Sequence, residues 1–405
     1  MSFKLRGQRD AVLVVVGVVL IVCVVAGGIF GCQRLFGETK KEEAVPQDKK
    51  EQQSRASKVD RVLKKMTLEQ KAAQVFVVEP EAITGVDAAT IAGDMTREAL
   101  EHYPVGGFCY FAQNLESPEQ TKELIANAQA YAKDACGLPL FACVDEEGGF
   151  VSRVANNDAF GVDNIGDMAD IGATGDVKAA RKAAEYVGGY LSELGFNVDF
   201  APVADIATSQ DGTMADRSFG KTPDEVAPMV AAMVKGFAQA GVLCSAKHFP
   251  GIGAAEGDSH NESIYSNDSI DDMLDWSLVP FKEAIKAGVP MIMVGHLLCQ
   301  GLEEGDTELP ASLNPKVIEE ILRKRLSYDG LVVTDSLQME AASAVCTPDQ
   351  QAVMALEAGA DLVLMPVDFE QAYQGLLDAV EDGTITEERL DESVRRIVAA
   401  KLDMA

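Results

Sequence analysis

Eight short apolar runs recur along the chain after residue 64, and segments with helical periodicity separate them. Nearly all of these runs are continuous rather than alternating, which is typical of parallel strands covered by helices. Strands that alternate with helices predict an α/β fold, and eight such units predict a single (β/α)8 TIM-type barrel. The alternative is an open doubly wound sheet. The sequence has no GxGxxG motif after the first predicted strand to support it. The eight runs are residues 74–78, 107–111, 140–145, 198–203, 243–247, 291–295, 331–334 and 362–365.

Two of the intervening segments carry clear helix-end signals. Residues 177–194 stop at Gly195, where a glycine C-cap would end a helix. Residues 223–240 begin with a proline, which suits the first helical turn, and Thr222 before it is a candidate N-cap. After the eighth run the chain adds two helical segments, and no second domain is expected.

The N-terminal segment predicts a membrane anchor. Residues 11–30 hold no charge and are long enough to span the hydrocarbon core of a bilayer. Three basic residues precede this run, so residues 1–10 are expected in the cytoplasm and the bulk of the chain outside. We therefore expect an uncleaved transmembrane signal-anchor over residues 11–31. In the alternative, the sequence IFGC acts as a lipoprotein signal, with cleavage before Cys32 and lipidation of that residue.

The segment after the anchor has a different composition. Residues 38–58 mix both charges with almost no apolar side chains, which predicts a flexible linker, placed at residues 32–58. The barrel is then expected to occupy residues 59–405. Because the chain has 35 Lys plus Arg against 64 Asp plus Glu, its net charge is −29, which argues against nucleic acid as a partner. We expect a monomer with no cofactor.

The eight cysteines show no metal-ligand spacing, so no metal site is expected. Several lie inside apolar runs, where they predict buried free thiols.

Polar side chains cluster directly after five of the predicted strands. They are Asp145 and Arg153 after the third, Arg217 after the fourth, Lys247, His248, Asp258 and His260 after the fifth, His296 after the sixth, and Asp335 after the seventh. Because active sites in such barrels form at the C-terminal ends of the strands, these residues predict one site. No catalytic role is assigned to His296.

Five separated blocks resemble glycoside hydrolase family 3, in its bacterial β-N-acetylglucosaminidase branch. The blocks are residues 145–149 (DEEGG), 217–220 (RSFG), 247–251 (KHFPG), 258–260 (DSH) and 334–339 (TDSLQM). They occur in the family's order, and the resemblance covers residues 63–402. It implies an enzyme that removes terminal β-linked N-acetylglucosamine with retention of configuration. It also implies a carbohydrate partner, with peptidoglycan fragments as the expected substrate outside the cell.

A retaining glycosidase needs a carboxylate that attacks the anomeric carbon and a proton donor for the leaving oxygen. Asp335, at the end of a strand, suits the nucleophile, and the resemblance implies the same role. The plain alternative is an aspartate that caps the following turn. The resemblance implies that His260 is the acid/base and that Asp258 pairs with it. A neighbouring carboxylate can fix the imidazole tautomer and favour its cation.

The residues expected to bind sugar hydroxyls are Asp145, Arg153, Arg217, Lys247 and His248, as their counterparts in the family do. Asp145 would accept hydrogen bonds, and the others would donate them. The alternative for the two arginines is ion pairing with local carboxylates.

The chain departs from the family pattern at two positions. It carries Phe150 where relatives often have arginine, and Ile252 where they often have histidine. Neither is the nucleophile or the acid/base, but both put the specificity for the leaving group in doubt.

Other functions stay open. A β-glucosidase of the same family is disfavoured because those relatives usually lack the Asp-Ser-His loop. A phosphorylase, in which phosphate replaces water, is harder to separate because it can use the same residues. A tethered sugar-binding protein without activity is the non-enzyme alternative. A metal-dependent hydrolase built on the histidines would differ in its sensitivity to EDTA.

Overall fold

Eight parallel strands form the centre of the protein. The computed structural model describes residues 47–404 apart from 209–212, 255–263 and 303–308, with side chains from residue 55. The strands are β1 (Phe76–Val78), β2 (Gly107–Cys109), β3 (Phe141–Val144), β6 (Val198–Asp199), β7 (Leu243–Phe249), β9 (Met291–Val294), β11 (Leu331–Thr334) and β12 (Val363–Leu364). Each predicted run overlaps one of them, and β7 extends two residues beyond its run, so all eight predicted strands are confirmed.

The strands close almost completely into a barrel of the TIM type. Hydrogen-bonded neighbours follow the order β11-β9-β7-β6-β3-β2-β1-β12, and every neighbouring pair is parallel. An isolated parallel bridge between Val333 and Leu362 joins the two ends of this order. The open doubly wound sheet is therefore wrong, because its two edge strands would not meet.

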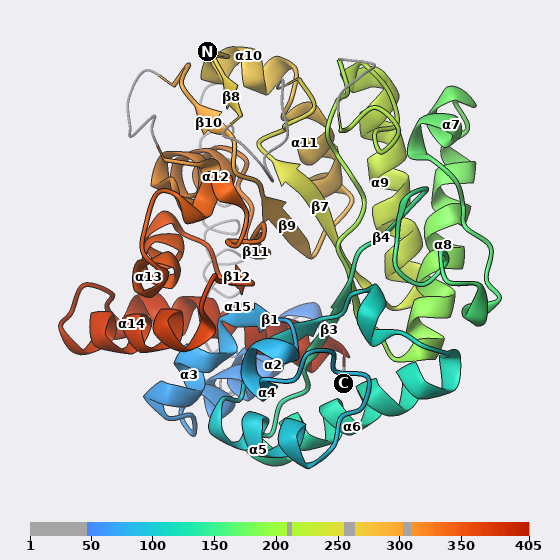
Figure 1. Ribbon diagram of the computed structural model, residues 1–405. Coiled ribbons are helices and arrows are strands. Elements are labelled where there is room, and N and C mark those ends of the chain that lie inside the picture. The colour runs from blue at the N-terminus through green and yellow to red at the C-terminus, as the bar shows by residue number, and fades with distance from the viewer. Residues whose placement is uncertain (1–46, 209–212, 255–263, 303–308, 405) are drawn as a thin grey trace, which may run out of the picture. The chain divides into compact units, whose positions relative to one another are not determined.

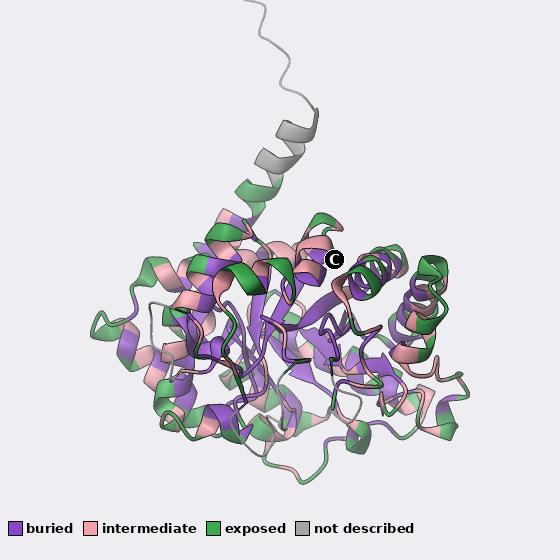
Figure 2. Cartoon of the chain, turned by 90° about the horizontal axis from the view of Figure 1, so that it is seen from above, coloured by how far each residue is buried: buried purple, intermediate pink, exposed green. Residues whose placement is uncertain are grey.

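Helices surround the strands (Figure 1). They are α3 (Leu68–Gln74), α4 (Glu81–Thr84), α5 (Asp94–His102), α6 (Pro118–Cys136), α7 (Met168–Ala173), α8 (Val177–Leu194), α9 (Pro223–Ala240), α10 (Ile270–Asp275), α11 (Val279–Lys286), the helical segment η4 (Lys316–Arg325), α12 (Glu340–Ser343), α13 (Pro348–Ala358), α14 (Phe369–Glu381) and α15 (Glu387–Met404). Buried residues concentrate in the strands and on the helix faces turned toward them, and exposed residues lie on the outer helix faces (Figure 2).

The helix ends follow the predicted signals. Helix α8 ends at Gly195, whose φ of 100° suits a residue without a side chain. Helix α9 begins with Pro223, and the Glu225 carboxylate accepts a hydrogen bond from the backbone N–H of Thr222 at 3.1 Å. Both predicted helices are confirmed with the predicted ends.

The segment expected to be a linker is partly helical. Helix α2 spans Gln47–Leu63, so residues 47–58 differ from the predicted flexible linker. The compact unit that holds the barrel begins at Arg55. Within that unit Val59 and Leu63 are buried, and Arg55 pairs with Asp403 of α15. The charged composition did not indicate a helix here, because from Arg55 onward its contacts are two buried apolar side chains and ion pairs to a helix far away in the sequence.

The predicted anchor lies outside the described residues, as do residues 1–10. Among the helices that the structure describes, none combines the length and the apolar character that a membrane span requires. Cysteines 109, 143, 244 and 299 are buried free thiols, as predicted, and 136 and 346 are free but less buried.

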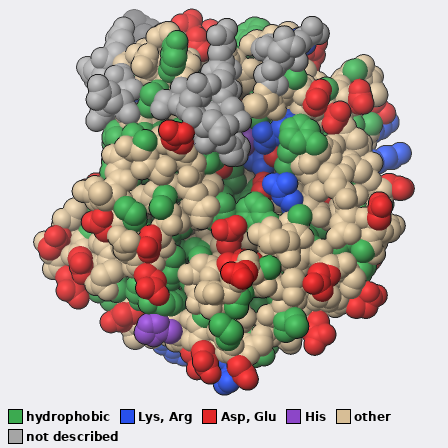
Figure 3. Space-filling model, viewed as in Figure 1, with side chains coloured by type: hydrophobic (Ala, Val, Ile, Leu, Met, Phe, Trp, Pro, Cys, Tyr) green, Lys and Arg blue, Asp and Glu red, His purple; other side chains and the backbone are tan. Residues whose placement is uncertain are grey.

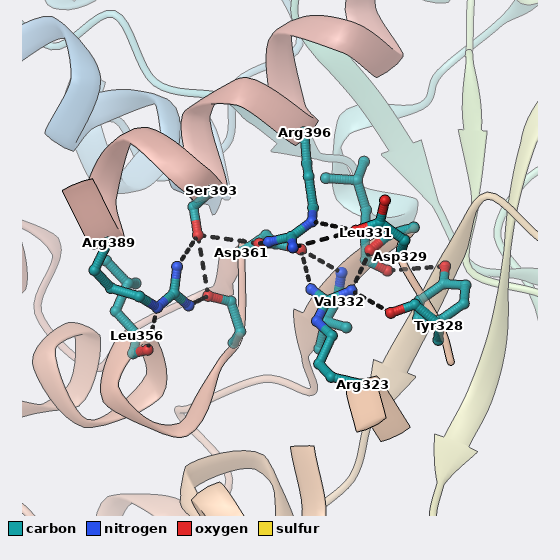
Figure 4. Close-up of polar contacts among 12 residues, drawn as sticks. Arg323, Tyr328, Asp329, Leu331, Val332, Leu356, Asp361, Arg389, Ser393 and Arg396 are labelled. Carbon is teal, nitrogen blue, oxygen red and sulfur yellow. Dashed lines mark hydrogen bonds and ion pairs between the residues drawn. The ribbon is translucent and has the colours of Figure 1, made fainter. Parts of the chain in front are cut away.

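A buried carboxylate ties the last helix to the end of the barrel opposite the strand C-termini. Asp361, just before β12, is fully buried and accepts hydrogen bonds from the N–H of Val332 and from Ser393 Oγ, both at 3.0 Å. Arg323 and Arg396 also converge on it, with N–O distances of 2.5 and 3.1 Å (Figure 4). This network joins η4, β11, β12 and α15, which lie far apart in the sequence.

Candidate active site

A pocket of about 380 Å³ opens where the strands end. It lies near the lower limit of the ~300–1,000 Å³ typical of small-ligand sites. Its lining includes six of the predicted residues, namely Asp145, Arg153, Arg217, Lys247, His248 and Asp335. Figure 3 shows basic and acidic side chains gathered beside a hollow in this face, with hydrophobic side chains around them. The structure therefore brings these six residues together in one pocket, and their roles stay a prediction.

Two carboxylates and two cations form the deep part of the pocket. The Nζ of Lys247 lies 2.7 Å from Asp145 Oδ1 and 2.6 Å from Glu147 Oε1. Arg217 donates two hydrogen bonds to Glu147, from Nε and Nη2, each of 2.7 Å. This bidentate pair fixes the guanidinium plane, and the remaining N–H groups of Arg217 can serve a ligand.

The charges of this cluster stabilise one another. Burial opposes the ionised form of Glu147, but Lys247 and Arg217 lower its pKa to about 2. Burial likewise opposes the cation of Lys247, but Asp145 and Glu147 raise its pKa. Glu147 and Lys247 are therefore ionised at neutral pH, and the cluster offers a ligand charged donors held in fixed positions.

Arg153 lies at the side of this cluster. Its Nη2 is 3.9 Å from Asp145 Oδ2, and its guanidinium lies over the ring of Phe111, 5.5 Å from the centroid. The two arginines therefore form ion pairs with local carboxylates, as the alternative expected, and they also line the pocket. The two readings are compatible because Asp145 and Glu147 line the same pocket.

His248 is oriented by Asp205, a fully buried residue that follows β6. The ring Nδ1 of His248 lies 2.7 Å from Asp205 Oδ2, and the same carboxylate accepts hydrogen bonds from the N–H groups of His248 and Ile252. An imidazole that donates its Nδ1–H to a carboxylate has a fixed tautomer, which leaves Nε2 as the nitrogen not engaged by Asp205.

Asp335 follows β11 directly and is partly exposed in the pocket. Burial raises the pKa of Asp335, but the nearby His248 and His296 and the N–H of Ser336 lower it by more. The net effect is a lowered pKa. The carboxylate is held by that N–H at 2.8 Å from Oδ1. Asp335 is therefore an ionised and positioned carboxylate, as a nucleophile must be.

His296 contacts the residue that follows Asp335. Its Nε2 lies 2.8 Å from the carbonyl oxygen of Ser336 and its Nδ1 lies 2.7 Å from Ser312 Oγ. Nε2 therefore contacts the backbone next to Asp335, and the contact of Nδ1 with Ser312 orients the ring.

One wall of the pocket is a small hairpin of β4 (Glu146–Gly148) and β5 (Val151–Ser152). Buried Glu146 anchors it, since its carboxylate accepts hydrogen bonds from the N–H groups of Arg153, Val154 and Ala155 at 2.7–2.8 Å. Tyr190 of α8 donates a further hydrogen bond to Glu146 at 2.8 Å. The hairpin thus positions Arg153 through its backbone.

Sequence reasoning missed Glu146, Glu147 and Asp205 as site residues. The first two lie in the DEEGG block, where two further acids beside Asp145 were an available signal. Asp205 lies after the fourth predicted strand, and a single aspartate in an apolar stretch gave no clear signal.

Asp258 and His260 lie outside the described residues. Within the described ranges, no group of three or more His, Cys, Asp or Glu side chains is arranged to hold a metal ion.

The fold and the pocket define an α/β-barrel protein with a charged site for a small polar ligand. Residues 67–400 match the family model described as the glycosyl hydrolase family 3 N-terminal domain, so the chain belongs to glycosyl hydrolase family 3. This confirms the family that the five sequence blocks resemble.

Relatives and solved structures agree with this membership. The chain is 34% identical over 328 residues to β-hexosaminidase A of Pseudoalteromonas piscicida, an alignment that covers 75% of this chain and 54% of the relative. It is 32% identical over 289 residues to a β-hexosaminidase of Nitrosomonas eutropha, which covers 70% of this chain and 80% of that relative.

A solved family 3 β-N-acetylglucosaminidase from Paenibacillus has a TM-score of 0.77 and 38% identity. The match covers 84% of this chain and 63% of that structure. The chain therefore spans just over half the length of the first relative and less than two thirds of this structure.

Proposed function

We propose that this protein is a retaining exo-β-N-acetylglucosaminidase. The observation that carries the proposal is the ionised Asp335 carboxylate, placed at a strand end in the same pocket as the Lys247–Glu147–Arg217 cluster. The β-hexosaminidase names of the relatives support the acetylated sugar as substrate. The small pocket suits one terminal sugar unit rather than the middle of a chain.

In the proposed mechanism Asp335 attacks the anomeric carbon while the glycosidic C–O bond breaks. His260, paired with Asp258, gives its proton to the leaving oxygen and later takes a proton from the water that hydrolyses the glycosyl-enzyme. The sugar hydroxyls are held by Asp145, Lys247, Arg217, Arg153 and His248. Because these side chains already contact protein partners that hold them in place, they need little rearrangement when the substrate binds.

We also propose that the enzyme is tethered at the cell membrane and acts outside the cytoplasm on peptidoglycan fragments. The uncharged residues 11–30 and the preceding basic residues support the tether, by a signal-anchor or by lipidation at Cys32. Fractionation of cells that express the full chain tests this proposal. Release of the protein by salt alone would contradict it.

The direct test is hydrolysis of an aryl β-N-acetylglucosaminide, compared with the aryl β-glucoside. We expect activity on the acetylated sugar, a loss of about 10³-fold or more in Asp335→Ala, and a smaller loss in His260→Ala because an aryloxide leaves without full protonation. Equal activity of both variants and wild type would overturn the assignment. A preference for the unacetylated sugar would indicate a β-glucosidase, and no turnover of either would favour a binding protein.

Two further measurements define the reaction. A slow 5-fluoro analogue of the substrate should leave a sugar covalently attached to the peptide that contains Asp335, which mass spectrometry detects. The same assay in phosphate buffer separates hydrolase from phosphorylase. Free sugar as the product supports the proposal, and sugar 1-phosphate would overturn it in favour of the phosphorylase.

A further inference from the structure

Phe150 is an exposed aromatic residue in the wall of a pocket whose lining combines the charged cluster with apolar side chains such as Phe111 and Met214. The residue is 62% exposed, and it lies between β4 and β5. Among the large hydrophobic side chains that the structure describes as exposed, Phe150 alone lines the pocket. A single exposed hydrophobic residue is ordinary on a protein surface, so its position and its support decide whether it has a role.

The backbone on both sides of Phe150 is held firmly. Gly149 donates its N–H to Asn164 Oδ1 at 2.9 Å, and its carbonyl accepts hydrogen bonds from Asn156 and Asn164. Asn156 Nδ2 also lies 3.3 Å from the carbonyl oxygen of Phe150. Gly149 has a φ of 55°, and a Cβ there would lie 2.0 Å from Asp167 Oδ1. The turn is therefore fixed in one shape, and it presents the ring instead of letting it fold away.

The lining residues differ in how far they are buried, which distinguishes a deep part of the pocket from its rim. Glu147, Lys247 and His248 are at most 5% exposed and form its deep part, whereas Phe150 lies at the rim. A terminal sugar held by the charged cluster would fill the deep part. The next group along the substrate, on the other side of the bond that breaks, would then lie beside the rim.

We propose that Phe150 is a specificity-determining residue that stacks on the first sugar of the leaving group. This inference rests on the proposed glycosidase function. A pyranose ring has C–H groups on its faces and hydroxyls around its edge, so a flat aromatic ring can cover a face without competing for the hydroxyls. Because the backbone is already fixed, little conformational entropy is lost when the sugar binds.

The test compares two substrates that share the terminal sugar. N,N′-diacetylchitobiose has a pyranose as its leaving group, and methyl β-N-acetylglucosaminide has only a methyl group. In Phe150→Ala we expect kcat/KM for the disaccharide to fall about tenfold and kcat/KM for the methyl glycoside to stay within about twofold. Phe150→Tyr should retain disaccharide activity because it keeps the ring, and Phe150→Leu should not.

A second readout follows from the two-step mechanism. Hydrolysis of the glycosyl-enzyme takes place after the leaving group has gone, so its rate should be the same in wild type and Phe150→Ala. Transfer of the sugar to added N-acetylglucosamine should decrease in the variant, because the acceptor uses the same rim. Ile91→Ala is the matched control, since Ile91 is 74% exposed and does not line the pocket.

The outcomes separate this inference from the proposed function. If the wild type cleaves both substrates and Phe150→Ala lowers both equally, or neither, Phe150 does not act on the leaving group and only this inference is overturned. If the wild type cleaves neither substrate, the proposed function fails and this inference fails with it.

Discussion

Glu147 lies between two cations, and its removal should show how much the cluster depends on it. Replacement by glutamine leaves Lys247 and Arg217 buried with one carboxylate fewer. We expect Glu147→Gln to lower the free energy of unfolding by about 3–5 kcal/mol, because it breaks a buried ion pair, and to reduce activity strongly. Urea unfolding at pH 7 measures the first effect. Glu185→Gln, which breaks the exposed pair with Arg181, should cost less than about 1 kcal/mol.

The lowered pKa of Glu147 also predicts that the stability difference between wild type and Glu147→Gln depends on pH. A carboxyl group whose folded pKa is lowered to about 2 contributes stability that is fully present above its ordinary pKa of about 4.5. That contribution is lost as the pH falls from about 4.5 toward 2. The difference in stability between wild type and Glu147→Gln should therefore be constant from pH 7 to 5 and shrink below pH 4.5. A difference that grew on acidification would contradict the assigned charge state.

At the scale of the element, the β4–β5 hairpin depends on one carboxylate. Glu146→Ala removes the acceptor for three backbone N–H groups, and we expect a cost of about 2–4 kcal/mol. Amide hydrogen exchange of residues 149–156 should become faster, whereas that of β9 and β11 should change little. Glu193→Ala, on the exposed face of α8, is the control. Unchanged exchange in the hairpin would mean that the asparagines around Gly149 hold it unaided.

The sequence predicted the elements better than the contacts between them. Strands and helices such as α9 depend on local periodicity and end signals, which the sequence contains directly. The six strand-end residues were predicted because the barrel brings the ends of its strands together. The role of Asp205 was not predicted, since it depends on a contact with His248 between the ends of the neighbouring strands β6 and β7. The helix over residues 55–58 was missed for the same reason, because Arg55 pairs there with Asp403 of the distant helix α15.

At the scale of the whole molecule, Asp361 joins parts of the chain that only the complete fold brings together. Asp361→Asn should lower the free energy of unfolding by about 3–5 kcal/mol, because it leaves Arg323 and Arg396 without their buried partner. Thermal unfolding measures this loss. Asp329→Asn removes a 93%-exposed partner of the same Arg396 and should cost less than about 1 kcal/mol. Equal losses in the two variants would show that burial does not govern this network.

The pairing of β1 with β12 also constrains how the protein is made. Phe76 and Val363 are register partners although about 290 residues of chain separate them. A ribosome that adds about 5–20 residues per second needs roughly 15–60 s to make that length, and β1 lacks this neighbour throughout. An unpaired strand edge is a site for wrong pairing with other chains. Expression of this protein should therefore depend more on chaperones and on translation rate than the stability of its finished barrel would suggest.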